Sequence, residues 1–296
     1  MHLTDPHLTS LADLPRGTLR GKRWSGYLSW RRRRRFVHRV EVLERLVAAV
    51  HAENPVQILV TGDLVHVGLA QEIEVAARWL EALGPPERVM LVPGNHDVYA
   101  RDSWSAVARL WGPYLSEPYD PLSPFPLRRV LESGGAALSL IGLSSAIPSA
   151  LFMAYGRLGA EQSRRLDALL AGARGLRCVL LHHPPLPAMS HWRKGLLDAA
   201  ELERVLRERG AELVLHGHVH RNVSRIGPGD ARIFGTASAS SGDEPARAAY
   251  RRFDLDAGPD GWRVEMQLVC VDADGGRRVI ETEQWTAPLR DQAMPV

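Results

Sequence analysis

A chain of 296 residues with 45% hydrophobic and 24% charged residues has the composition of an ordinary globular protein. No apolar run approaches the roughly 20 residues that span a bilayer, so we exclude an integral membrane protein. We expect one domain over 1–296 and no secretory signal, because Asp5 arrives before the apolar region of a signal could fit. Cys178 and Cys270 lie far apart in apolar runs, which indicates buried thiols and a reducing compartment, the cytoplasm.

The net charge of +3 hides an uneven distribution. Ten of the 37 Lys and Arg residues lie between Arg16 and Arg39, where there is no Asp or Glu, and the rest of the chain has an acidic balance. A basic segment on an acidic body suggests an anionic partner. Three interpretations of segment 16–39 stay open: a lid, a solvated face, and a surface that contacts an anionic membrane through Arg31–Arg35. We predict no specific nucleic-acid partner.

The apolar pattern predicts alternating strands and helices over the first 215 residues. In chain order, the predicted strands are 1–4, 58–61, 89–92, 127–132, 137–144, 178–181 and 213–215, and the predicted helices are 36–52, 71–83, 103–110, 159–173 and 197–209. Residues 9–33 are expected to form a long loop, so Arg31–Arg35 would stand where a helix begins. After residue 220 the alternation is typical of antiparallel strands, at 231–239, 247–255, 262–271 and 277–285. We therefore predict an α/β fold with two sheets.

Polar motifs follow five of the predicted strands. They are Asp5-Pro6-His7, Gly62-Asp63, Gly94-Asn95-His96-Asp97, His182-His183-Pro184 and Gly217-His218-Val219-His220. Carboxylate, imidazole and amide oxygen are the ligand mixture of borderline divalent metals, unlike the all-oxygen sites of Ca²⁺ or the thiolate sites of structural Zn²⁺. In an extended backbone, both members of each D-x-H or H-x-H pair point to one side. Two such pairs and a carboxylate able to bridge exceed what one ion needs, which indicates two metals.

In this order the motifs resemble the pattern DxH, GD, GNH(D/E), H and GHxH of the calcineurin-like metallophosphoesterase superfamily, over roughly residues 1–225. The resemblance implies a four-layer α/β/β/α sandwich, two mixed β-sheets flanked by helices, with a dinuclear metal site at the strand ends. One metal would be bound by Asp5, His7, Asp63 and His220. The other would be bound by Asp63, Asn95, His182 and His218, with Asp63 bridging the two. His96 would protonate the leaving oxygen, and Asp97 would orient His96.

The expected chemistry follows from two divalent ions, for which Mn, Fe and Zn are the leading candidates. They lower the pKa of a bridging water, and the resulting hydroxide attacks phosphorus in line. A histidine with an ordinary pKa is a suitable proton donor to the leaving group. Two imidazoles compete for the single-histidine position: the motif favours His182, which leaves His183 near the pocket.

The second motif, which begins at Gly62-Asp63, limits the class of substrate. Protein serine/threonine phosphatases carry GDxxDRG, whereas this chain has Gly62-Asp63-Leu64-Val65-His66-Val67-Gly68. In form it is closest to the bacterial class III cyclic-nucleotide phosphodiesterases, which implies a nucleotide-type phosphodiester, with cyclic nucleotides as candidates. His66, His183, Arg193 and Lys194 are candidate substrate contacts. For His66 and for the basic tip around Arg193, a hydrogen-bonded or solvated loop residue is the alternative.

Two other functions stay open. The first is a hydrolase peripheral to the inner face of the membrane that cleaves a lipid-linked or nucleotide-lipid pyrophosphate such as UDP-diacylglucosamine. The second is a non-catalytic metal-binding protein of the same fold. The second is disfavoured because a pure binding module has no use for His96, which is not among the expected ligands.

Overall fold

The computed structural model describes residues 1–12, 14, 17–115, 125–133, 135–242, 246–272 and 275–289. Within these residues, the strands form two six-stranded sheets. The first sheet has the order β12-β11-β10-β1-β2-β3, in which β1, β2 and β3 are parallel and β10, β11 and β12 are antiparallel. Its strands are β1 (His2–Leu3), β2 (Ile58–Val60), β3 (Val89–Leu91), β10 (Ala249–Gly258), β11 (Gly261–Val271) and β12 (Arg277–Ala287).

The second sheet has the order β4-β5-β6-β7-β9-β8, with parallel pairing from β5 to β9 and an antiparallel strand at each edge. Its strands are β4 (Leu127–Ser133), β5 (Ala136–Gly142), β6 (Leu176–Leu180), β7 (Leu213–His216), β8 (Val223–Ile226) and β9 (Arg232–Gly235). The longer helices are α1 (Lys22–Ser29), α3 (Val40–Ala52), α4 (Ala70–Leu83), α5 (Ser103–Leu115), α6 (Ala160–Gly172) and α7 (Ala199–Arg209). The prediction of two mixed sheets flanked by helices is confirmed.

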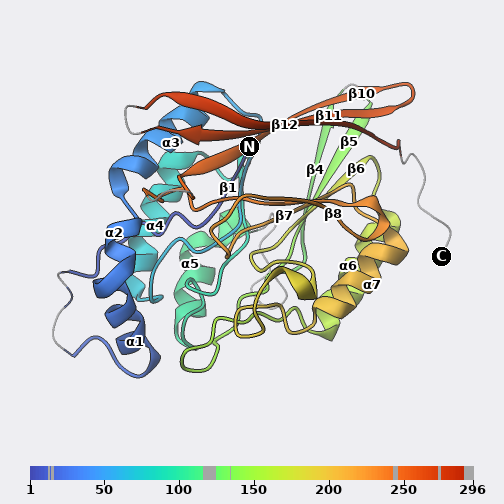
Figure 1. Cartoon of the computed structure of the whole chain (residues 1–296). Helices are drawn as coiled ribbons and strands as arrows, with labels where there is room; N and C mark the ends of the chain where they lie inside the picture. Colours follow the sequence, from blue (N-terminus) through green and yellow to red (C-terminus); the bar gives the residue numbers. More distant parts are fainter. Residues whose placement is uncertain are drawn as a thin grey trace.

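The layers follow from side chains that alternate along the central strands. In β6, Cys178 and Leu180 belong to the main core, whereas Val179 belongs to a second cluster that α6 and α7 cover. The same division separates Leu215 from Val214 in β7. Because successive strand residues point to opposite faces, each strand is apolar on both sides and is buried between two layers. Figure 1 shows α3 and α4 at one side of the molecule and α6 and α7 at the other, with the strands between them.

The basic segment differs from the prediction. Residues 22–37 are helical: α1 continues into the π-helix η1 (Trp30–Arg34) and a last turn, α2 (Arg35–Val37). The arginine run therefore lies at the end of a helix, where cations complement the helix dipole, and not at its start. The next helix begins at Val40 because the backbone is extended at the two residues before it. We call residues 22–39 the cap; Arg16 lies outside the described residues.

Two further expectations concern compartment and membrane. Both cysteines are buried and free, as predicted. Across the described ranges, none of the helices has the length and apolar character needed to cross a bilayer. The cytoplasmic location stays a prediction.

Candidate metal centre

The polar motifs gather where parallel strands end. Asp63 follows β2, Asn95 follows β3, His182 follows β6 and His218 follows β7. Parallel strands present their carboxyl ends at one edge of a sheet, which is where ligands bind in open α/β sheets. The two sheets face each other, so residues distant in sequence meet there: His220 Nε2 lies 3.0 Å from Asp5 Oδ1.

The backbone at these positions is strained rather than extended. Asp5, His7, Asp63, His218 and His220 all have positive φ, between 43° and 70°. The expectation that each D-x-H or H-x-H pair points to one side because its backbone is extended is therefore wrong. Left-handed conformations are uncommon in residues other than glycine, and they cluster at functional sites where the surrounding structure enforces them. The strain therefore marks this edge of the sheets as a site.

One group of side chains contains Asp5, His7 and His220. The Nε2 atoms of His7 and His220 lie 3.4 Å apart, and the second carboxylate oxygen of Asp5 accepts hydrogen bonds from Thr4 and from the backbone of His218. His7 Nδ1 lies 3.0 Å from the carbonyl of Val65 and donates to it, which leaves the Nε2 lone pair directed into the site. Such anchoring is typical of metal-binding imidazoles.

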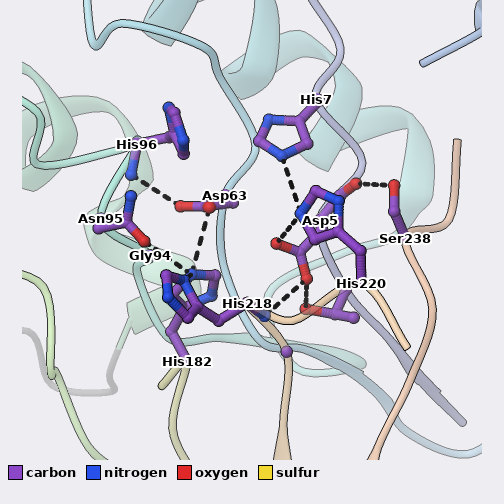
Figure 2. A network of polar contacts seen from close by, with 12 residues as sticks. Asp5, His7, Asp63, Gly94, Asn95, His96, His182, His218, His220 and Ser238 are labelled. Atoms are coloured by element: carbon purple, nitrogen blue, oxygen red, sulfur yellow. Dashed lines mark hydrogen bonds and ion pairs between the residues drawn. The ribbon is translucent and has the colours of Figure 1, made fainter. Parts of the chain in front are cut away.

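The second group contains Asp63, Asn95, His182 and His218, shown beside the first in Figure 2. His182 Nε2 lies 3.2 Å from Asp63 Oδ2, from Asn95 Oδ1 and from His218 Nδ1. Its Nδ1 donates to the carbonyl of Thr61 at 2.7 Å, so Nε2 is the free nitrogen. The carboxylate of Asp63 lies within 4.8 Å of ligand atoms of His182 and His218 in one group, and of Asp5 and His7 in the other. The structure thus brings all seven predicted ligands together, with Asp63 where a bridging carboxylate is required.

Burial and neighbouring carboxylates set the charge state of these histidines. Burial lowers the pKa of His7 and of His218 and keeps these imidazoles neutral, the form that binds metal. Burial alone would also lower the pKa of His182, but the carboxylates of Asp63 and Asp5 outweigh it and raise that pKa to about 9, so a metal bound at Nε2 would displace a proton from His182. Imidazole nitrogens approach each other closely in both groups, at 3.4 Å between His7 and His220 and at 3.2 Å between His218 and His182. A cation between such nitrogens stabilises the arrangement. The residues therefore fit two metal ions.

Asp97 makes different contacts from the expected ones. Each of its carboxylate oxygens accepts two backbone N–H groups: Oδ2 from Asp63 and Gly94 at 2.8 Å, and Oδ1 from Leu64 and Val65 at 2.7 and 3.2 Å. The His96 ring is held instead by its Nδ1, which donates to the backbone carbonyl of His66. Asp97 therefore joins the loops after β2 and β3. The expected contact that would orient His96 is made by a backbone carbonyl.

Glycine is required where these two loops meet. A Cβ on Gly94 would overlap the Asp63 carboxylate, and one on Gly62 would overlap the Gly94 backbone. Gly62 also has a φ of 85°. The Asp63 carboxylate is thus placed by a close approach of two backbones, and it accepts the His96 N–H at 2.7 Å.

The candidate substrate residues occupy different environments. Both ring nitrogens of His183 contact the protein, Ser145 Oγ at 2.8 Å and the carbonyl of Ala154 at 3.1 Å, so neither is left for substrate. His66 is buried, its ring is stacked on that of His7 at 5.0 Å, and its Nδ1 has no hydrogen-bond partner within the described part of the chain. Arg193 is exposed and stacks on Trp192.

Lys194 is exposed too, but charges of the cap act on it. Partial burial and the charges of Arg34 and Arg33 lower its pKa. The positive charge of Lys194 in turn contributes to the lowered pKa of His218, which is an interaction with the site.

Two site residues were missed, and both come from the cap. The donor atoms of His38, His7 and His220 lie within 4.8 Å of one another, and the rings of His38 and His7 are 4.3 Å apart. His38 Nδ1 contacts Ser240 Oγ at 2.9 Å, so its Nε2 is the nitrogen available to the site. The second is Arg34, whose NH1 lies 3.2 Å from His96 Nδ1. Neither residue belongs to a metal motif: the sequence singled out Arg34 only as part of the basic run Arg31–Arg35, and it carries no signal for His38.

The fold and the site together define a metal-dependent phosphoesterase. The chain belongs to the calcineurin-like phosphoesterase family, whose family model matches residues 1–222. It is 29% identical over 228 residues to a probable cyclic nucleotide phosphodiesterase of Synechococcus sp., covering 74% of this chain and 79% of that protein. It is 30% identical over 163 residues to a glycerophosphodiester phosphodiesterase of Enterobacter lignolyticus, covering 55% and 50% of the two chains.

Solved structures agree on the fold. A dimetal phosphatase from Danio rerio superposes with a TM-score of 0.62 at 15% identity, covering 96% of this chain and 97% of that one. At that identity the likeness concerns architecture alone, and it matches the two facing sheets described above.

Proposed function

We propose that this protein hydrolyses a nucleotide-type phosphodiester, with cyclic nucleotides as the leading candidates, using two divalent metal ions. One observation carries the proposal: seven side chains from five strand ends form two ligand groups that share Asp63. The relatives named above, a probable cyclic nucleotide phosphodiesterase and a glycerophosphodiester phosphodiesterase, support a diester as substrate.

The metals, once bound, would supply a nucleophile from water at neutral pH and neutralise the phosphate oxygens. The chain's own residues supply the rest. The backbone N–H of His96 and the close approach of Gly94 fix the position of the Asp63 carboxylate. Asp63 can therefore serve both ligand groups at once. His96 keeps a proton on Nδ1 through the His66 carbonyl, so Nε2 is the nitrogen that would face the leaving oxygen, and it would donate a proton when the ring is in its imidazolium form. The six residues other than Asp63 would complete the two metal sites: Asp5, His7, Asn95, His182, His218 and His220.

The test is hydrolysis of bis(p-nitrophenyl) phosphate by metal-free protein reconstituted with Mn²⁺, Fe²⁺ or Zn²⁺, followed by a panel that includes 3′,5′-cyclic AMP and glycerophosphodiesters. We expect turnover that is abolished in Asp63→Ala and His96→Ala, with metal content lost only in Asp63→Ala. Exposed Glu44→Ala is the matched control and should keep full activity. If no metal supports turnover, the proposal that the protein is an enzyme is refuted. The alternative of a non-catalytic metal-binding protein would then remain.

A second candidate rests on the outer face of the cap. Arg31, Arg32, Arg33 and Arg35 are exposed, and Trp24 and Phe36 on the same segment are 52% and 55% exposed. A basic and aromatic surface is typical of contact with anionic lipid, in which case a lipid-linked pyrophosphate becomes the substrate class. Flotation with phosphatidylserine vesicles distinguishes a lipid-linked substrate from a soluble one. It compares the wild type with a variant whose four exposed arginines are changed to Gln. Equal recovery of both proteins would remove this candidate.

A further inference from the structure

The cap is fixed on the body of the protein at both ends. At its start, Arg23 forms an ion pair with Asp102 at 2.8 Å and also donates to the backbone carbonyls of Val67 and Gly68. At its end, Arg39 N donates to the Ser240 carbonyl at 2.9 Å, beside an isolated bridge between His38 and Ser241. The cap therefore forms a fixed wall of the metal centre.

The π-helix turns two cap residues toward that centre. Trp30 is buried in a small apolar cluster with Val67, Leu69 and Tyr99, and its ring lies 6.4 Å from that of His66. Arg34, one turn further on, is the partly buried member of a run whose other arginines are exposed. A π-turn adds a residue to one turn of helix, which changes the direction of the side chains that follow, and such turns are frequent at functional sites.

Among the described residues, Arg34 has no carboxylate in direct contact, although the charges of Asp63 and Glu72 act on it. Its NH1 lies 3.2 Å from His96 Nδ1, but that nitrogen directs its proton to the His66 carbonyl and offers no lone pair. Within the part of the chain that the structure describes, no carboxylate forms an ion pair with Arg34, whereas Arg23 of the same cap has one. A guanidinium withdrawn from water without an anion is costly, so the position is suited to a ligand that supplies one.

A second cation lies on the same side of His96. The Tyr99 ring stacks on the His96 ring with centroids 5.4 Å apart, and Lys22 Nζ lies 4.4 Å from the centre of the Tyr99 ring. Burial and the charge of Arg34 lower the pKa of Lys22 to about 8, so the two cations are close enough to repel each other. Positive charge thus accumulates on the cap side of His96, and the Asp63 carboxylate partly offsets it.

Resting on the proposed function, we propose that Arg34 is a substrate-binding residue that donates hydrogen bonds to phosphate oxygens of the ester. The planar guanidinium presents paired donors that match two oxygens of one phosphate, which an ammonium group cannot do. Lys22 is the neighbouring cation for the same anion. The arginine run therefore has divided roles: Arg34 faces the substrate, and the exposed arginines face solvent.

The test is calorimetric titration of the Mn²⁺-loaded protein with inorganic phosphate, in the wild type, Arg34→Met, Arg34→Lys and the control Arg32→Met. Loss of charged hydrogen bonds predicts that Arg34→Met binds phosphate about 10- to 100-fold more weakly than the wild type. The phosphate affinity of Arg34→Lys should be intermediate, because lysine keeps the positive charge but lacks the paired N–H donors of the guanidinium. Arg32→Met, which changes an exposed arginine of the same turn, should bind like the wild type, and metal content should be equal in all four.

Chemical rescue separates binding from structural damage. Millimolar guanidinium should restore phosphate binding to Arg34→Ala and should have no effect on Arg32→Ala. Wild-type affinity in Arg34→Met would overturn the proposal, as would weak binding in Arg34→Ala that guanidinium does not restore. Either result is distinct from failure of the proposed function, in which the wild type itself turns over no phosphodiester.

Discussion

Asp97→Asn tests whether Asp97 joins two loops or orients His96. Asparagine has the same shape as aspartate but replaces one acceptor oxygen with an NH₂ group. Each oxygen of Asp97 accepts two backbone N–H groups, so asparagine loses two hydrogen bonds whichever way its amide turns. At roughly 1.5–3 kcal/mol for each hydrogen bond to a charged acceptor, the free energy of unfolding should fall by about 3–6 kcal/mol.

Urea unfolding followed by circular dichroism measures this loss, and calorimetry with Mn²⁺ measures the metal affinity of the folded variant. We expect the urea midpoint and the metal affinity to fall together, because Asp63 takes its position from the same loop. The exposed carboxylate of Asp256 offers a matched control, and Asp256→Asn should leave both unchanged. If Asp97→Asn keeps the wild-type midpoint and metal affinity and loses only turnover, Asp97 orients His96 and our assignment is wrong.

Two other variants probe features that the motifs do not contain. His38→Ala should weaken the binding of one of the two metals by about 10- to 100-fold, as loss of a supporting imidazole does, and a titration with Mn²⁺ that matches the wild type would exclude His38 from the site. Glu212→Gln should lower the free energy of unfolding by about 3–5 kcal/mol, because it leaves the buried guanidinium of Arg177 without its anion. The exposed pair of Arg204 with Glu201 gives the comparison: Glu201→Gln should cost less than about 1 kcal/mol, and equal losses in the two glutamine variants would contradict the role of burial.

The parts of the fold that the sequence predicts are those with a strong local pattern. Strands β2, β3, β6 and β7 are short apolar runs, and each is followed by a polar motif, so the meeting of these motifs follows from parallel pairing. The cap lacks such a pattern, because residues 9–33 mix Gly, Pro and Arg without an apolar period. Its helix is held by long-range contacts such as that of Arg23 with Asp102.

The same distinction applies within the site. Residue type and order predict the seven ligands, because metal chemistry limits the side chains that can serve. His38 is held at the site by its contacts with Ser240 and Ser241, and three of the four backbone groups that donate to Asp97 lie about 33 residues away. Contacts of this kind depend on tertiary structure, and a single sequence carries no pattern that reveals them.

The position of β1 has a consequence for how the site assembles. This two-residue strand lies between β2 and β10, and the backbone after it is held by residues from the far end of the chain: Ala239 N donates to the Thr4 carbonyl at 2.9 Å, and Ser238 Oγ donates to that of Asp5 at 2.6 Å. A chain cut after residue 222 would retain all seven ligands, yet β1 would become an edge strand without these supports. During synthesis the ligands emerge before the residues that position them, so we expect native metal binding only in a chain that already includes β10.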